Sequence, residues 1–225
     1  MTTYGSANPN LALPTTRLVL KHNERPRMSR TRQASIAVGL TLAMACAYAG
    51  TSRHMSGTSM LLGDAVHGCA FRDGDRISLR ADTGKYFGVC NNCIPDAAYP
   101  DAAFVHADTV DPSAVWTVKL AGAGKVALQG ANGKYLARCT NCAPIATHND
   151  EAFVHVADWT EGPWAQWTCV DAGAGKVAFA DDVGQYLARC NNCVNGAYPD
   201  AGFLHETHYA AKHHAQWTAN RVPGN

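Results

Sequence analysis

The sequence predicts an all-β fold built from three related units of about 50 residues each. The first observation is an internal repeat: each unit carries a Gly-x-Tyr turn, a Cys-x-Asn-Cys motif, a Phe-x-His motif and a Trp-Thr pair. The tyrosines Tyr86, Tyr135 and Tyr186 are 49 and 51 residues apart. The second observation is that no stretch after residue 70 shows sustained helical periodicity. Landmarks that keep their spacing over three copies indicate a repeat architecture.

Each repeat contains four short segments with the character of β-strands. A Val/Ile-x-Leu-like segment and a Tyr-Leu/Phe segment alternate in polarity, and a turn ending at Gly84, Gly133 or Gly184 joins them. Glycine at these positions can take the positive φ that a tight hairpin needs. The Phe-x-His and Trp-Thr segments supply two further strands. Twelve strands are therefore expected.

One such unit cannot bury its own apolar face, so the three must share a core. A propeller blade also has four strands, but three blades fall below the usual number for that fold. We therefore predict a β-trefoil over residues 69–222, with repeats at about 69–118, 119–168 and 169–222. Counting back from Ile77 and Val177 places Cys69 level with Cys169, so residues 68–71 are expected to form a strand that opens the first repeat.

The Gly-Lys-Tyr-Leu hairpin followed about 30 residues later by Trp-Thr resembles the fascin and hisactophilin branch of β-trefoils. That resemblance implies the trefoil fold and, as a function, binding to filaments or proteins. The Gln-x-Trp signature of ricin-type lectins is absent, since the tryptophans follow Val115, Gln166 and Gln216 directly. The resemblance covers the repeats only, and a shared fold does not establish a shared function.

The N-terminal 50 residues have the features of a targeting segment. Six Lys/Arg residues stand there against Glu24 alone, and an apolar run after Arg32 leads to Ala47-Tyr-Ala49. A basic flank, a short apolar stretch and an A-x-A site are the parts of a secretory signal peptide. We predict export to a secreted, periplasmic or extracellular location, and the arrangement fits a signal peptide best if translation starts at Met28. Lipid modification of Cys46 is the alternative to cleavage, and residues 51–68 are interpreted as a linker.

The charge balance and the motifs of residues 51–225 exclude several classes of function. This part of the chain holds 13 basic against 17 acidic residues, so it lacks the basic surface that nucleic-acid binding requires. No nucleophile elbow, phosphate loop or HExxH motif occurs, and the polar residues recur symmetrically instead of converging on one site. We therefore expect a protein that is not an enzyme, needs no cofactor, has no membrane span after signal removal and binds a glycan or an extracellular protein.

Nine cysteines are present, and eight remain once Cys46 is set aside. Six form Cys-x-Asn-Cys pairs, and an even number in an exported chain favours disulfides. The predicted local bridges are Cys90–Cys93, Cys139–Cys142 and Cys190–Cys193. Free thiols are one alternative, and a metal site in each repeat is another, with Cys90, Cys93 and His106 or their equivalents as ligands. Cys69 and Cys169 are interpreted as small buried residues, with a disulfide between them as the alternative.

Polar and aromatic residues that recur beside these cysteines are candidate ligand-binding residues. An Asn, an Asp and a His occur in every repeat, accompanied by Tyr99, Tyr198 or, in the second repeat, His148. Aromatic faces beside amide and carboxylate groups are typical of sugar sites, which predicts a multivalent lectin with one site per repeat. Turn and strand-end roles are the structural alternative for these polar residues. The complete set is Asn92, Tyr99, Asp101, His106, Asn141, His148, Asp150, His155, Asn192, Tyr198, Asp200 and His205.

Two features break the symmetry of the repeats. The third repeat adds His208, His213 and His214 near His205, which predicts either a pH-sensitive patch or a solvated loop. The second repeat adds Trp159 and Trp164. These tryptophans mark either one distinctive pocket or a cover over the barrel mouth.

Overall fold

The computed structural model of the chain describes residues 65–224. The predicted targeting segment, Met28, Cys46 and residues 51–64 of the predicted linker lie outside this range. Ala65 forms a bridge with Asn220, and Val66 is fully buried, so the folded part includes residues before position 69. No helix among residues 65–224 is both long enough and apolar enough to cross a bilayer.

The described residues form twelve β-strands and four short 3₁₀ helices, which confirms the predicted all-β fold. The strands and helices of repeat 1 are β1 (Arg76–Arg80), β2 (Tyr86–Asn91), β3 (Asp101–Ala107), η1 (Pro112–Ala114) and β4 (Val115–Gly122). Those of repeat 2 are β5 (Lys125–Gln129), β6 (Tyr135–Thr140), β7 (Asp150–Val156), η2 (Trp159–Glu161), η3 (Pro163–Ala165) and β8 (Trp167–Gly173). Those of repeat 3 are β9 (Lys176–Ala180), β10 (Tyr186–Asn191), β11 (Asp200–Glu206), η4 (His213–Ala215) and β12 (Trp217–Arg221).

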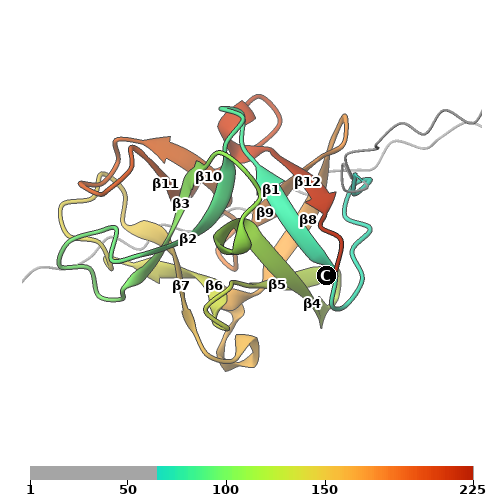
Figure 1. Cartoon of the computed structure of the whole chain (residues 1–225), viewed down its shortest axis with the longest axis horizontal. Helices are drawn as coiled ribbons and strands as arrows, with labels where there is room; N and C mark the ends of the chain where they lie inside the picture. The colour runs from blue at the N-terminus through green and yellow to red at the C-terminus, as the bar shows by residue number, and fades with distance from the viewer. Residues whose placement is uncertain (1–64, 225) are drawn as a thin grey trace, which may run out of the picture. The chain divides into compact units, whose positions relative to one another are not determined.

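The first and last strands of the repeats close into a barrel. Antiparallel pairing runs from β1 to β4, β5, β8, β9 and β12, and β12 pairs again with β1. Figure 1 shows these strands on the right and the remaining strands on the left. The repeats divide at the turns 123–124 and 174–175, a few residues after the expected divisions, because β4 and β8 continue past the Trp-Thr pairs.

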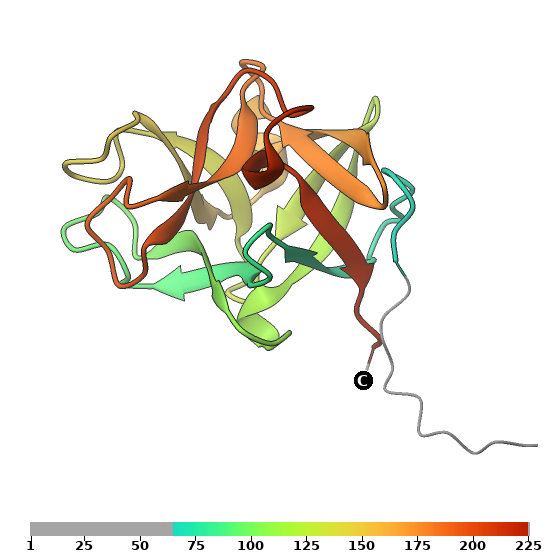
Figure 2. The same cartoon turned by 90° about the horizontal axis from the view of Figure 1, so that it is seen from above.

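The inner hairpins β2–β3, β6–β7 and β10–β11 cap one end of the barrel. At the cap the second residue of each inner strand pairs with the phenylalanine of another repeat: Ala102 with Phe153, Glu151 with Phe203 and Ala201 with Phe104. This cyclic pairing, with the closed barrel, defines a β-trefoil. The loops that follow β2, β6 and β10 gather at the cap end, at the left of Figures 1 and 2.

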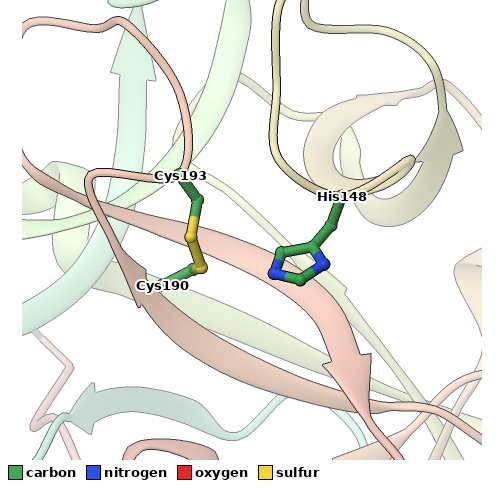
Figure 3. A group of neighbouring side chains, drawn as sticks. All are labelled: His148, Cys190 and Cys193. Atoms are coloured by element: carbon green, nitrogen blue, oxygen red, sulfur yellow. A yellow bond between two sulfur atoms is a disulfide. The ribbon is translucent and has the colours of Figure 1, made fainter.

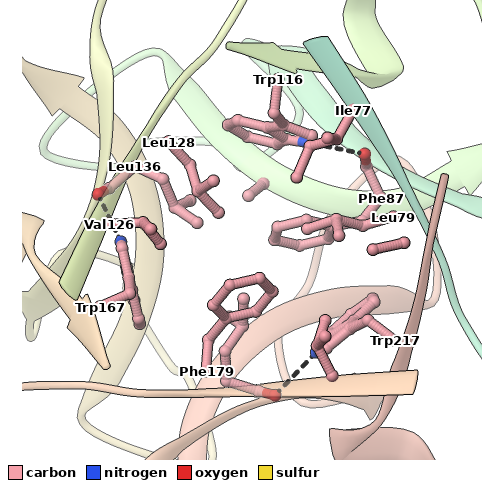
Figure 4. Packing of buried hydrophobic residues seen from close by; sticks show 14 of the residues in the cluster. Ile77, Leu79, Phe87, Trp116, Val126, Leu128, Leu136, Trp167, Phe179 and Trp217 are labelled. Carbon is pink, nitrogen blue, oxygen red and sulfur yellow. Dashed lines mark hydrogen bonds between the residues drawn. The ribbon is translucent and has the colours of Figure 1, made fainter. Parts of the chain in front are cut away.

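The core is built from side chains that recur in each repeat. Trp116, Trp167 and Trp217 are fully buried, and each indole Nε1 donates a hydrogen bond to the carbonyl of Phe87, Leu136 or Leu187 at 2.9–3.1 Å. Figure 4 shows the three indoles with these bonds around the shared core. Buried indole nitrogens with a backbone partner satisfy their polar atom without solvent. The Trp-Thr motif of the sequence is therefore a core motif.

The predicted hairpin turns are also confirmed. Gly84, Gly133 and Gly184 have φ values of 86°, 78° and 84°. In each turn the glycine amide donates to the carbonyl of the residue three positions earlier. A side chain at this position would strain the backbone. The glycines thus fix the β1–β2, β5–β6 and β9–β10 connections.

The segment before β1 differs from the prediction. Residues 68–71 form no strand, because β12 already pairs with β1 and occupies the edge where that strand would lie. Cys69 instead forms a disulfide with Cys169 on β8, at a Cα–Cα distance of 5.8 Å. The interpretation of these two cysteines as unpaired small residues is therefore wrong, and the alternative holds. The disulfide ties the start of the folded part to the barrel.

Candidate functional site

The Cys-x-Asn-Cys motifs form turns, and each is closed by its own disulfide: Cys90–Cys93, Cys139–Cys142 and Cys190–Cys193. The asparagine between the cysteines has a positive φ of 54° to 58° in all three repeats. Asparagine tolerates this left-handed conformation better than most residues. The backbone amides of Asn92, Asn141 and Asn192 each donate to the residue before the next strand at 2.6 Å. The recurring asparagine therefore has a structural role in the turn.

The loop after each disulfide turn reaches across to another repeat. The amide of Ala98 donates to the carbonyl of Cys142, that of Thr147 to Cys193, and that of Ala197 to Cys93, each at 2.8 Å. The three loops thus form a closed cycle, in which every repeat contacts the turn of the following one. This cycle decides which side chains meet at the surface.

Because of this cycle, the recurring aromatic residue packs on the histidine of a different repeat. Tyr99 lies on His155 with ring centroids 4.3 Å apart, His148 on His205 at 4.6 Å, and Tyr198 on His106 at 4.9 Å. The sequence grouped each aromatic with the histidine of its own repeat. The structure instead forms three junctions, each named here by its histidine: the His106, His155 and His205 junctions.

The recurring aspartates are held by neighbours inside the protein. Asp101 accepts from Asn91 and Asn132, Asp150 from Thr140 and Arg138, and Asp200 from Asn191 and Arg189. Asp101 and Asp200 are buried. Carboxylates with two internal donors have fewer lone pairs left for a ligand. Their position next to the junctions is as predicted, and direct ligand binding by them stays a prediction.

Two arginines that the sequence analysis did not single out connect neighbouring repeats. Arg138 donates from Nε and Nη2 to Asp182 at 3.0 Å each, and Arg189 does the same to Asp82 at 2.8 and 3.0 Å. Bonding to these carboxylates raises the pKa of both guanidinium groups, and the pKa of Asp82 is lowered chiefly by its bond to Arg189. The recurrence of Leu-Ala-Arg-Cys in repeats 2 and 3 was the signal that could have identified them.

The His155 junction opens into a cleft of about 430 Å³. It is called the Trp164 cleft here, and its lining residues are Tyr99, Arg138, Cys139, Thr140, His155, Val156, Glu161 and Trp164. The two large aromatic side chains are more than a third exposed, which is unusual for a tyrosine and a tryptophan beside a core. The extra Trp164 of repeat 2 thus marks a distinctive pocket. Trp159 packs against a small buried cluster that includes Tyr135.

Local backbone structure holds the Trp164 indole at the cleft. Pro163 begins the short helix η3, and Gly162 precedes it with an extended backbone. A Cβ atom on Gly162 would lie only 2.2 Å from the Trp164 ring, so the indole lies directly against this glycine. Glu161 is held by the N-cap of η2, where its Oε1 accepts from the amide of Asp158 at 3.0 Å. The cleft therefore presents a fixed aromatic face beside an acidic group.

His155 contributes a neutral imidazole to this cleft. Burial lowers the pKa of His155 below its usual value, so the ring carries no charge at neutral pH. Its Nδ1 atom is buried and has no hydrogen-bond partner among the described residues. By contrast, Nδ1 of His106 lies 3.2 Å from the carbonyl of Phe104. Neutral donors and acceptors between aromatic faces suit an uncharged polar ligand.

The His205 junction differs in its chemistry. His148 of repeat 2 lies beside the Cys190–Cys193 disulfide of repeat 3, as Figure 3 shows, and no group of His106 or its equivalents with the cysteines of the same repeat occurs among the described residues. The predicted metal sites, Cys90, Cys93 and His106 with their equivalents, are therefore not assembled among residues 65–224. The paired sulfurs are also bonded to each other. A second group of His205, Glu206 and His214 lies at the same junction.

No protein-family model and no curated protein sequence matches this chain. Solved structures do match its fold. An SDF2-like protein from Arabidopsis thaliana is 17% identical, covers 65% of this chain and 92% of its own length, and has a TM-score of 0.50. A Caenorhabditis elegans protein described as of unknown function is 11% identical, with 67% and 97% coverage and a TM-score of 0.50.

A further similar structure is an exo-β-1,3-galactanase from Clostridium thermocellum, 15% identical with a TM-score of 0.51. It covers 68% of this chain, but the chain spans only 31% of that enzyme. At these identities the likeness extends to the fold alone. The narrower resemblance to fascin and hisactophilin stays a prediction.

Proposed function

We propose that this chain is a secreted or periplasmic carbohydrate-binding protein without enzymatic activity, with its principal sugar site in the Trp164 cleft. The observation that carries the proposal is that two partly exposed aromatic side chains, Tyr99 and Trp164, line one cleft that also holds hydrogen-bonding groups. A sugar ring has apolar C–H faces and a polar hydroxyl rim. Aromatic faces suit the former and fixed polar groups the latter.

The polar groups of the cleft match this ligand class. Arg138 is paired with Asp182 and Asp150, and His155 is uncharged, so the cleft has no uncompensated positive charge. Glu161 and Thr140 supply acceptors and a hydroxyl. A neutral, hydroxyl-rich ligand is therefore favoured over a nucleotide or another anion.

The four disulfides support the proposed location, because disulfides persist in oxidising compartments and are rare in the cytosol. Several separate bridges in one domain fit a protein that works outside the cell or in the periplasm. The matched galactanase gives support only of a general kind, since it places a similar fold within a protein named for action on a polysaccharide.

The test is a glycan array followed by calorimetry with the best-bound sugar. Trp164→Ala and Tyr99→Ala should each weaken binding by at least about tenfold, because burying a large aromatic side chain against a ligand contributes about 1.5–3 kcal/mol. Tyr198→Ala is the matched control: both tyrosines are 39% exposed and pack on a histidine ring, but the Tyr198 junction has Ser113 at the position of Trp164. It should leave affinity unchanged.

Two results would contradict the proposal. One is an array without any bound glycan at millimolar concentration. The other is a sugar whose affinity falls equally with Tyr198→Ala and Tyr99→Ala, which would restore the original expectation of equivalent sites in every repeat. Binding to actin filaments in co-sedimentation, with no glycan bound, would favour the filament-binding alternative.

A further inference from the structure

The third repeat carries a convergent group of ligand-type side chains, called the His214 cluster: His205 and Glu206 at the end of β11 and His214 in η4. Glu206 Oε1 lies 2.8 Å from Nε2 of His214 and 3.7 Å from Nε2 of His205. The three ligand atoms all lie within 4.8 Å of one another. Two imidazoles and a carboxylate thus point at one small volume from two elements.

We propose that the His214 cluster binds one divalent transition-metal ion, with Zn²⁺ as the best-fitting example. Two histidines and one carboxylate form a common zinc ligand set, which leaves one position for water or another ligand. Ligand atoms about 2.0–2.1 Å from a tetrahedral ion are about 3.4 Å apart. The observed separations of 2.8 and 3.7 Å bracket that value, so small side-chain rotations suffice to admit an ion.

The surroundings favour binding at this position. The side chains of His205, Glu206 and His214 are 13%, 14% and 28% exposed, so they are held by the protein yet open on one side. The ring of His148 stacks on His205 and limits its rotation. His205 also lines a cleft of about 240 Å³, so this member of the cluster is reached from solvent.

The charged neighbour of the cluster contacts one oxygen of Glu206 and leaves the other, Oε1, to the two histidines. Lys212 is 3.4 Å from Oε2 of Glu206, on the oxygen that does not face the imidazoles, and its own side chain is 46% exposed. It can therefore move away without breaking a buried contact. Nδ1 of His205 is buried and has no hydrogen-bond partner within residues 65–224, so this part of the chain does not supply the hydrogen bond that usually strengthens a zinc-bound histidine. We expect moderate affinity.

The cluster belongs to repeat 3 alone, although the junction histidine is present in every repeat. The positions of Glu206 and His214 hold Val156 and Trp164 in repeat 2. In repeat 1 the same positions hold Ala107 and Ser113. Neither set can complete a metal site around its histidine. The proposal is therefore independent of sugar binding in the Trp164 cleft.

The experiment is calorimetric titration of the full chain with Zn²⁺, with the disulfides oxidised and Cys46 alkylated. His214→Gln and Glu206→Gln should each weaken the strongest binding event by about 100-fold or more, because second-shell changes alone cost about 10- to 100-fold. His213→Gln is the matched control, since it removes the exposed neighbour of His214. His106→Gln removes the equivalent junction histidine, and both controls should retain binding.

Thermal melting of each variant without metal establishes that it is folded, and Cu²⁺ provides a second readout by electron paramagnetic resonance. A spectrum with nitrogen coupling in the native chain that is lost in His214→Gln supports the site. Unchanged Zn²⁺ affinity in folded His214→Gln and Glu206→Gln overturns the proposal. So does an equal loss in His106→Gln or His213→Gln, because that result would mean scattered surface histidines bind the ion.

Discussion

The His155 and His205 junctions share a framework of stacked rings and a bridging arginine, and they differ in the side chains beside that framework. In both, a histidine at the end of an inner strand lies under an aromatic ring from another repeat, and an arginine joins a hairpin of the following repeat. Above this framework, repeat 2 places Trp164 and repeat 3 places His214 at equivalent positions. The position after the histidine differs as well, with Val156 in repeat 2 and Glu206 in repeat 3. Two positions therefore distinguish the aromatic cleft from the cluster of ligand-type groups. The fold supplies the geometry, and a few positions supply the chemistry.

The largest expected effect comes from removing part of the core that the repeats share. Trp167→Ala deletes a fully buried indole and leaves the Leu136 carbonyl without its donor, so the free energy of unfolding should fall by about 3–5 kcal/mol. Chemical denaturation measures this loss. Trp164→Ala, three residues away and exposed, is the control and should change stability little. An unchanged denaturation curve for Trp167→Ala would contradict the core assignment.

The second prediction concerns the arginine that joins repeats. Arg189→Val removes two bonds to Asp82 and one to Asp200, which should lower stability by about 1.5–3 kcal/mol. The contact between repeats 1 and 2 is already an apolar version of this one. Val89 of repeat 1 stands where repeats 2 and 3 have arginine, and Ala131 of repeat 2 stands where repeats 1 and 3 have the paired aspartate.

The double variant Arg189→Val with Asp82→Ala copies that apolar version. It should recover part of the lost stability, because Asp82 is then no longer left without its partner. Urea denaturation of the two variants measures the recovery. If the double variant is less stable than Arg189→Val alone, the two charges do not act as a pair.

The smallest expected effect depends on pH and distinguishes repeat 2 from its neighbours. Glu151 is buried at the cap where repeats 1 and 3 have Ala102 and Ala201, and burial raises the pKa of its carboxyl to about 7. Between the unfolded value near 4.5 and about 7, the folded state holds a proton that the unfolded state releases. Stability from this group therefore falls as the pH rises through that window.

Glu151→Gln should remove this loss. At pH 8 the variant should be more stable than the native chain by about 1–2 kcal/mol, and at pH 4 the two should be nearly equal. The measurement is the denaturation midpoint across that pH range. A constant difference at both pH values would mean that packing, and not ionisation, separates the two proteins.

Most of the fold could be predicted from the internal repeat of the sequence. The spacing of tyrosine, histidine and tryptophan predicted the twelve strands, the shared core and the trefoil, because each landmark has one structural role in every copy. The three local disulfides were also predicted. Cys69 was misplaced, because counting back along the chain assumes a strand at an edge that β12 already occupies.

The sequence singled out Tyr99 and His155 of the candidate cleft as site residues, but it did not predict that they meet each other or Arg138. Ligand binding by the predicted residues stays a prediction. The stacking of Tyr99 on His155 depends on which neighbour a loop leans against, and that is decided by the closure of the barrel and not by distance along the chain. The equivalence of the Trp164 and His214 positions was also missed in the sequence, for a related reason. The connection from the histidine to the tryptophan is two residues shorter in repeat 1, so the equivalence appears only when positions are counted back from the core indoles.

The cyclic contact of the three loops has a consequence for how such a chain diversifies. Each junction takes its aromatic ring from one repeat and its histidine from another, so three unlinked identical copies assembled as a homotrimer would have three identical junctions. Fusion into one polypeptide removes that constraint, since each copy can then change separately. A substitution in one repeat changes the surface chemistry where that repeat meets the next one. Repeats of this kind can therefore diverge at their boundaries.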